Sequence, residues 1–256
     1  INITVKDRVH GLKLGRARTG KYVRLPRQDR FREATVRSHE TGQWCAFPNF
    51  SEIRKYTGVN KAKNFEIFRD ILNDNHMGSM GHDFMMASGK LQAICYKHEI
   101  EKTLRTPDYA GFQLLALNDY SGQGTALVGL LDVFFEEKGY INADEFRRFC
   151  SPTVPLARIP KFVYTNDEAF HADIEVSHFG ASPLQEAKTV YSIKNEYGKV
   201  YAHGTVGTQN IPVGNLCTLG SVDMKLSGIT KPQKLNMEIR IEGSDAVNDW
   251  DFWVYP

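Results

Sequence analysis

Two short runs in this sequence hold side chains that could do chemistry. In the first, His39-Glu40-Thr41-Gly42-Gln43-Trp44, a carboxylate is flanked by hydrogen-bonding groups and by an indole that could stack on the apolar face of a sugar. The run is not the zinc-protease motif H-E-x-x-H, because Gln43 stands where the second histidine is required. Glu40 is therefore a candidate for nucleophilic or acid/base work, and a structural glutamate that caps the following loop is the alternative.

The second run is Asn118-Asp119-Tyr120-Ser121-Gly122-Gln123-Gly124-Thr125. Its glycines, together with Gly129, match neither the dinucleotide fingerprint G-x-G-x-x-G nor a P-loop ending in G-K-[ST]. The run predicts a tight turn that leads into a helix, and we expect no phosphate cradle there.

The histidine and cysteine positions do not suggest a metal centre. His76 and His82 flank two methionines, and no carboxylate lies at ligand spacing, so we expect no metal site there. The four cysteines form no C-x-x-C pair, and we predict buried, reduced thiols: Cys45, Cys95, Cys150 and Cys217.

The elements that must position the two runs follow from hydrophobic periodicity. Residues 34–39 read as a strand, helical spacing extends over residues 53–72, and residues 82–104 read as a second helix. The predicted apolar side of that second helix comprises Phe84, Leu91, Ile94, Cys95, Ile100 and Leu104. Residues 111–117 form a continuous apolar run, which suits a strand buried on both faces. Strand, helix and strand make a parallel βαβ unit, so both reactive runs should lie at the same edge of a sheet.

The pattern of predicted elements changes near residue 155, from helices alternating with strands to short strands alone. Helices are expected at 125–135 and at 143–149, the latter capped by Asn142, and prolines 152, 155 and 160 read as a linker. Beyond them, short alternating strands are predicted at 172–176, 189–193, 199–202, 220–226, 235–241 and 249–254. Residues 195–198 form a hairpin turn between two of these strands. This pattern predicts an immunoglobulin-like β-sandwich without the Cys-Trp-Cys spacing of antibody domains.

Composition sets broad limits. The 256 residues carry a formal net charge of +2, and no apolar run approaches the roughly 20 residues that a membrane-spanning helix needs. Residues 1–37 nevertheless hold eleven basic and three acidic side chains, a local excess of eight positive charges. We interpret this basic arm as a solvated surface or tail, and nucleic-acid binding is the alternative. Because the chain opens on Ile1, we expect a mature form or a fragment.

Several runs, in order, resemble the C-terminal part of bacterial glycoside hydrolases related to family two, the β-galactosidase-like enzymes. The resemblance covers residue 34 to the end and rests on residues 38–45, 55–58, 64–69, 87–92, 111–115, 122–129 and 248–256. It implies a multidomain α/β plus all-β protein: a basic segment at 1–33, the C-terminal part of a (β/α)₈ barrel at 34–154, and an immunoglobulin-like sandwich at 155–256. Residues 1–33 depart from the expected family pattern.

The resemblance also implies a retaining β-glycoside hydrolase in which residues 34–40 and 111–117 are the seventh and eighth barrel strands. Glu40 matches the position of the catalytic nucleophile. The substrate-binding residues would be His39, Gln43, Trp44, Asn118, Asp119 and Tyr120. The family's acid/base glutamate comes from strand four, which would precede this chain, and Asp119 is the nearby carboxylate that could replace it. We therefore expect weak or no activity from the chain alone.

A carbohydrate substrate and no cofactor are implied, together with a secreted or periplasmic location. We expect no membrane partner and no nucleic-acid partner. A homo-oligomer, or contact with missing domains of a parent protein, would cover exposed sheet edges. A non-catalytic carbohydrate-binding or scaffold module is the alternative, and the sandwich aromatics Tyr191, Tyr201, Trp250 and Trp253 motivate it.

Overall fold

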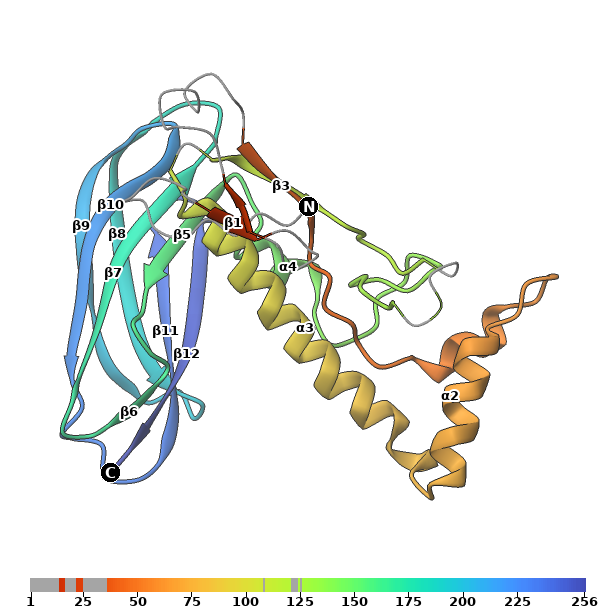
Figure 1. The fold of residues 1–256 in the computed structure, drawn as a ribbon. Coiled ribbons are helices and arrows are strands. Elements are labelled where there is room, and N and C mark those ends of the chain that lie inside the picture. Colours follow the sequence, from red (N-terminus) through yellow and green to blue (C-terminus); the bar gives the residue numbers. More distant parts are fainter. Residues whose placement is uncertain (1–13, 17–21, 25–35, 108, 121–123, 125) are drawn as a thin grey trace. The chain divides into compact units, whose positions relative to one another are not determined.

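The computed structural model describes residues 14–16, 22–24, 36–107, 109–120, 124 and 126–256 (Figure 1). The chain divides into two compact units, the first formed by Ile1–Thr103 and Tyr109–Phe146, the second by Leu104–Asp108 and Arg147–Pro256. Most of the basic arm lies outside the described residues. The nucleic-acid hypothesis, which rests on that arm, therefore falls outside them too. Within the arm, strands β1 (Leu14–Arg16) and β2 (Tyr22–Arg24) pair antiparallel.

The first unit contains the predicted strand, helix and strand. β3 (Val36–Thr41) is followed by the 3₁₀ helix η2 (Phe50–Lys55), α2 (Lys63–Asp74), the 3₁₀ turn η3 (Gly78–Met80) and the long α3 (Gly81–Leu104). The chain then returns as β4 (Tyr109–Leu114), which pairs with β3 in parallel, with Val36 opposite Tyr109 and Thr41 opposite Leu114. The parallel βαβ unit is confirmed, and its strand ends lie at one edge.

The predicted apolar side of α3 is wrong in part. Leu91 and Ile94 are more than half exposed, whereas Gln92 and Tyr96 are buried. Periodicity marks where apolar residues repeat along a helix, but it does not say which face a polar backbone segment will occupy. In this helix the buried face binds such a segment through hydrogen bonds, as described below.

Two further predictions for the first unit need correction. Residues 126–135 form no helix, and their backbone instead folds against the end of β4, with the amide of Leu131 donating to the carbonyl of Leu117. The 111–117 run is only half-buried, with Leu117 about half exposed, because within the described chain β4 pairs with β3 alone. The short helix α4 (Ala143–Arg147) is present, and Asn142 caps it.

No barrel is formed by the described residues, whose parallel strands are limited to the β3–β4 pair and the β6–β12 pair of the second unit. The first unit is thus a mixed α/β region with few helices. No helix in the described ranges is long and apolar enough to cross a membrane.

The second unit is a sandwich of two sheets (Figure 1). One sheet has the order β10–β7–β5 and the other β6–β12–β11–β8–β9. The bounds are β5 Thr153–Arg158, β6 Val163–Thr165, β7 Ala169–His178, β8 Leu184–Asn195, β9 Val200–Ile211, β10 Gly214–Lys225, β11 Gln233–Ile241 and β12 Val247–Tyr255. All six predicted strands are present, each longer than expected, and β5 and β6 are additional.

The core of the sandwich consists of alternate, inward-facing side chains from both sheets. Ile174 on β7, Ile193 on β8 and Met237 on β11 are fully buried, and the rings of Phe170 and Phe252 stack with centroids 4.3 Å apart. The linker expected around the three prolines is wrong, because Thr153–Arg158 forms β5 and Pro155 pairs opposite Val176. A proline fits there because β5 is an edge strand.

Candidate active site

Glu40 lies near the end of β3 in a conformation that is rare for a side chain other than glycine. Its φ is +58°, in the left-handed region that costs an L-residue about 1–2 kcal/mol. Its side chain is 29% exposed, so the carboxylate can be reached from solvent. The amide of Gln43 turns back to donate both to its Oε2, at 3.0 Å, and to the Glu40 carbonyl, at 3.2 Å. Backbone strain of this kind persists where surrounding contacts hold it, often at functional sites.

His39 lies beside Glu40 and bonds to the neighbouring strand. Its Nδ1 lies 2.9 Å from Oε1 of Gln113 on β4, an acceptor, so Nδ1 carries the donated proton. Its Nε2 lies 3.9 Å from Oε1 of Glu40. Sequence reasoning did not single out Gln113, which stands within the apolar run of β4 and reaches His39 only because the two strands pair.

The backbone after Glu40 is held at successive residues. The carbonyl of Thr41 accepts from the amide of Leu115 at 2.9 Å, which ties the end of β3 to the end of β4. Gly42 follows with φ +84°, and a Cβ at this position would lie 2.0 Å from the ring of Tyr96. Only glycine therefore allows both the turn and the close approach of the helix.

Four polar residues on one face of α3 bind the backbone of residues 42–47. We call Ser88, Gln92, Tyr96 and Glu99 the polar stripe; their spacing of four, four and three residues places them on one side of the helix. Glu99 accepts from the Gly42 amide at 2.8 Å, and Tyr96 donates to the Gly42 carbonyl at 3.0 Å. Further along the stripe, Gln92 donates to the Trp44 carbonyl at 2.6 Å, and Ser88 accepts from the Phe47 amide at 2.8 Å.

The Tyr96 hydroxyl joins three segments of the first unit. Besides the carbonyl of Gly42, it lies 2.8 Å from the carbonyl oxygen of Val128 and 3.4 Å from that of Ala116. Burial, with a smaller effect from the Glu99 charge, raises the pKa of Tyr96 far above its ordinary value. The hydroxyl therefore keeps its proton and remains a donor.

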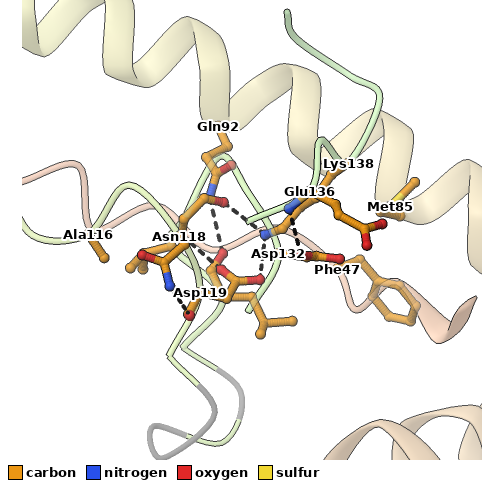
Figure 2. A network of polar contacts seen from close by, with 12 residues as sticks. Phe47, Met85, Gln92, Ala116, Asn118, Asp119, Asp132, Glu136 and Lys138 are labelled. Atoms are coloured by element: carbon orange, nitrogen blue, oxygen red, sulfur yellow. Dashed lines mark hydrogen bonds and ion pairs between the residues drawn. The ribbon is translucent and has the colours of Figure 1, made fainter. Parts of the chain in front are cut away.

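A buried ion pair supports the second predicted run (Figure 2). Asp119 Oδ2 lies 2.5 Å from Nζ of Lys138, and Asp119 Oδ1 accepts from the amide of Gly129 at 2.8 Å. Lys138 also donates to the Gly129 carbonyl at 2.8 Å. A side chain at Gly129 would overlap the backbone of Asn118 and Asp119, with contacts of 2.2 Å. Asp119 is 1% exposed, and its contacts with Lys138 and with the Gly129 amide hold the loop together.

A further buried carboxylate near this pair belongs to Glu52. Glu52 on η2 is 0% exposed, and neither carboxylate oxygen has a hydrogen-bond partner in the described part of the chain. Burial, followed by the negative charges of Asp132 and Asp119, raises the pKa of Glu52 to about 7, against the opposing effect of Lys138 and Lys55. Glu52 is therefore largely protonated below neutral pH.

The pKa of Asp132 is shifted in the opposite direction to that of Glu52. Burial alone would raise its pKa, but the Lys55 ammonium, 2.5 Å from Oδ2, and the backbone amides of Phe134 and Glu136 hold that pKa below its ordinary value. Asp132 stays ionised beside a protonated Glu52. Figure 2 shows Asp132 and Lys138 in the loop segments and Gln92 extending from α3, where its side-chain amide donates to the Leu127 carbonyl at 3.0 Å.

The other predicted site residues differ in exposure. Trp44 and Tyr120 are 46% and 62% exposed as whole residues, and both rings remain available to a ligand. Asn118 is half-buried and donates to the carbonyl of Asp119 within its own loop. In the sandwich, Trp250 is buried in the core and Tyr191 and Tyr201 are half-buried against it, so Trp253, 39% exposed, is the most exposed of the four aromatics considered there.

The structure also bears on the cysteine and metal expectations. The four cysteines are unpaired, but the prediction that they are buried is wrong: Cys45 is exposed and the other three are half-buried. Within the described ranges, no group of three or more histidine, cysteine, aspartate or glutamate side chains is placed to hold a metal ion.

Comparison with known families finds one match. Residues 168–256, from the start of β7 to the C-terminus, match the model of a domain of unknown function, DUF8488. No curated protein sequence matches the chain.

Solved structures that match parts of the chain include glycoside hydrolases. The β-glucuronidase of Parabacteroides merdae matches with a TM-score of 0.30 and 14% identity, over 40% of this chain and 14% of the enzyme. The exo-chitosanase CsxA of Amycolatopsis orientalis matches with a TM-score of 0.43 and 13% identity, over 74% of this chain and 21% of the enzyme. The chain thus spans about a seventh and a fifth of the lengths of these two enzymes.

A smaller protein matches as well. The CARDB domain of a Pyrococcus furiosus protein has a TM-score of 0.29 and 13% identity, over 41% of this chain and 94% of that domain. These likenesses concern parts of the fold at low identity.

Proposed function

We propose that this chain carries the nucleophile half of a retaining β-glycosidase site, with Glu40 as the nucleophile. The observation that carries the proposal is the position of Glu40: its accessible carboxylate lies at the end of a parallel strand, on a strained backbone, oriented by Gln43 and flanked by His39. Chemistry in folds with parallel strands is found at these carboxyl ends. The family resemblance of the sequence supports the same residue.

The proposed step is a displacement at the anomeric carbon. A carboxylate oxygen of Glu40 forms an ester bond to C1 of the sugar, the bond from C1 to the leaving oxygen breaks, and a proton from a second carboxyl group neutralises that oxygen. His39 and Gln43 would orient Glu40, while Trp44 and Tyr120 would offer aromatic faces to the sugar. The strands around Glu40 would then belong to the C-terminal part of a (β/α)₈ barrel, with the sandwich following it.

The second carboxyl group is not assigned within the described residues. Asp119, the candidate substitute, is buried and paired with Lys138, so it is not proposed as the acid. A retaining pair requires carboxyl groups about 5–5.5 Å apart. The test therefore uses a substrate whose leaving group needs no proton.

The test is covalent trapping of Glu40 in the full 256-residue chain. A panel of 2-deoxy-2-fluoro-β-glycosyl fluorides of the galacto, gluco and glucurono series is incubated with the protein, and intact mass and peptide mapping are recorded. We expect one sugar attached to Glu40 through an ester, with fluoride released. Glu40→Gln should abolish labelling, whereas the control Glu137→Gln, at an exposed carboxylate of the same unit, should leave it unchanged.

Two outcomes would reject the proposal. One is the absence of any label at Glu40 with every member of the panel. The other is a label that persists in Glu40→Gln, because the nucleophile would then be another group.

A further inference from the structure

We infer that Tyr96 and Glu99, at the C-terminal end of the polar stripe, are positioning residues for the nucleophile. This inference rests on the proposed function of Glu40 and deepens it, because it identifies what holds the carboxylate in its reactive orientation. Both residues lie on α3, more than fifty positions from Glu40 in sequence, and both bind the backbone of Gly42.

The first step of the argument is the strain at Glu40. A left-handed φ at a glutamate relaxes unless neighbouring contacts over-determine it. Gly42 is bound at both of its polar groups, because Glu99 accepts from its amide and Tyr96 donates to its carbonyl. With the Thr41 carbonyl bonded to Leu115, the backbone just beyond Glu40 has little freedom to unwind.

The second step is the route from this backbone to the carboxylate. Gln43 follows Gly42 directly, and its side-chain amide donates to Oε2 of Glu40. The orientation of Gln43 depends on the turn at Gly42, and the turn depends on the two helix residues. Tyr96 and Glu99 thus act on the nucleophile through the backbone, without contacting a substrate.

The third step is the charge of the Glu99 acceptor. An ionised carboxylate accepts a hydrogen bond about twice as strongly as a neutral acceptor, and glutamine in its place would still accept from the Gly42 amide. Glu99→Gln should therefore preserve the geometry with a weaker bond. Glu99→Ala removes the acceptor.

The experiment measures the rate of covalent labelling of Glu40 in the full chain, using the glycosyl fluoride that labels it fastest. For Glu99→Ala and for Tyr96→Phe we expect the maximal labelling rate to fall about tenfold or more, with the half-saturating reagent concentration changed less than about twofold, because orientation rather than binding is lost. Glu99→Gln should recover most of the rate.

The matched control is Ser88→Ala. Ser88 also binds backbone from α3, at Phe47, but its bond lies five residues beyond the turn at Gly42. The variant loses a comparable hydrogen bond and should change labelling less than about twofold. Hydrogen exchange at the Gly42 amide, faster in Glu99→Ala than in Ser88→Ala, gives a readout that does not depend on chemistry.

The outcomes separate the two proposals. If the wild-type chain is labelled at Glu40 and the Tyr96 and Glu99 variants are labelled equally fast, the positioning role is wrong and the nucleophile assignment stands. If Ser88→Ala slows labelling as much as Glu99→Ala, the effect is general loss of stability, and the positioning role is again wrong. A wild-type chain that is not labelled rejects both.

Discussion

The two units differ in the kind of side chain that they bury: mainly apolar ones in the sandwich, and several charged ones in the first unit. The sandwich has one continuous apolar core, and in the described chain its buried acidic and basic side chains are limited to Glu175 and His178. The first unit buries Glu52, Glu101, Asp119, Asp132 and Lys138, and its apolar cluster around Phe65 is small. Buried charges require paired partners and cost more than apolar packing.

This difference indicates what each unit needs from its interior. Apolar side chains can stabilise regular strands, whose backbone groups already bond to one another. Irregular segments such as residues 42–47, 118–120 and 126–138 have amides and carbonyls that no regular strand or helix pairs, so buried polar side chains from α3 and from the loops must satisfy them. The candidate active site lies in the unit with the irregular backbone.

The largest effect is expected for a truncation in the sandwich core. Phe252→Ala removes a ring that stacks on Phe170 and is 0% exposed, and should lower the free energy of unfolding of the sandwich by about 3–5 kcal/mol, measured by urea denaturation. Trp253→Ala, one residue along and partly exposed, should cost about 1 kcal/mol or less. Labelling of Glu40 should be unchanged in Phe252→Ala under conditions where the sandwich stays folded. A loss of labelling there would show that the units are not separable.

The next effect tests the buried ion pair. Lys138→Met leaves the Asp119 carboxylate buried without its cation and should cost about 3 kcal/mol of unfolding free energy in the first unit. Lys188→Met, at the exposed pair with Glu242 on the sandwich, should cost about 0.5 kcal/mol or less. Equal losses in the two variants would contradict the distinction between the two interiors.

A third prediction concerns the pH dependence caused by Glu52. Its pKa in the folded chain is about 7, above the ordinary value of 4.5, so the folded state binds the proton more tightly. Its contribution to stability is therefore fully present below about pH 4.5 and declines as the pH rises through 7. Glu52→Gln mimics the neutral form at every pH. The variant should match the wild type near pH 4.5 and exceed its free energy of unfolding by about 2–3 kcal/mol above pH 7.

The measurement for Glu52 is urea denaturation of both proteins from pH 4.5 to 8, followed as the difference between them. Taking the difference removes the pH dependence of the other carboxylates. A constant difference across this range would mean that Glu52 titrates normally.

The smallest effect is at the cap of α4. Asn142 Oδ1 accepts from the amide of Glu145 at 2.9 Å, and the Glu145 carboxylate accepts from the Asn142 amide at 3.0 Å, which is a capping box. Asn142→Ala should cost about 1 kcal/mol in urea denaturation, and Asn142→Ser should restore most of it. If the serine variant is no more stable than the alanine variant, the cap contributes nothing beyond side-chain size.

Much of the fold could be predicted from the sequence, because its regular elements have a strong local signal. The alternation of residues 172–176 and 235–241, the helical period of residues 82–104 and the capping residue Asn142 each describe an element that its own residues specify. The helix predicted at 125–135 was wrong because the backbone of this segment bonds to Leu117 and Asp119. Local helix propensity takes no account of such partners elsewhere in the chain.

The candidate site divides in the same way. The sequence alone identified Glu40 at a strand end, with Gln43 close enough to reach it, because these relations span only a few residues. Only the tertiary structure could reveal Gln113 beside His39, or the polar stripe of α3 against residues 42–47, since pairing of distant segments decides them. The helical spacing of Ser88, Gln92, Tyr96 and Glu99 can be read from the sequence. Polar residues that repeat at this spacing, however, normally lie on a solvent-exposed face of a helix. Burial against an irregular backbone, which has donors and acceptors to satisfy, turned that face inward.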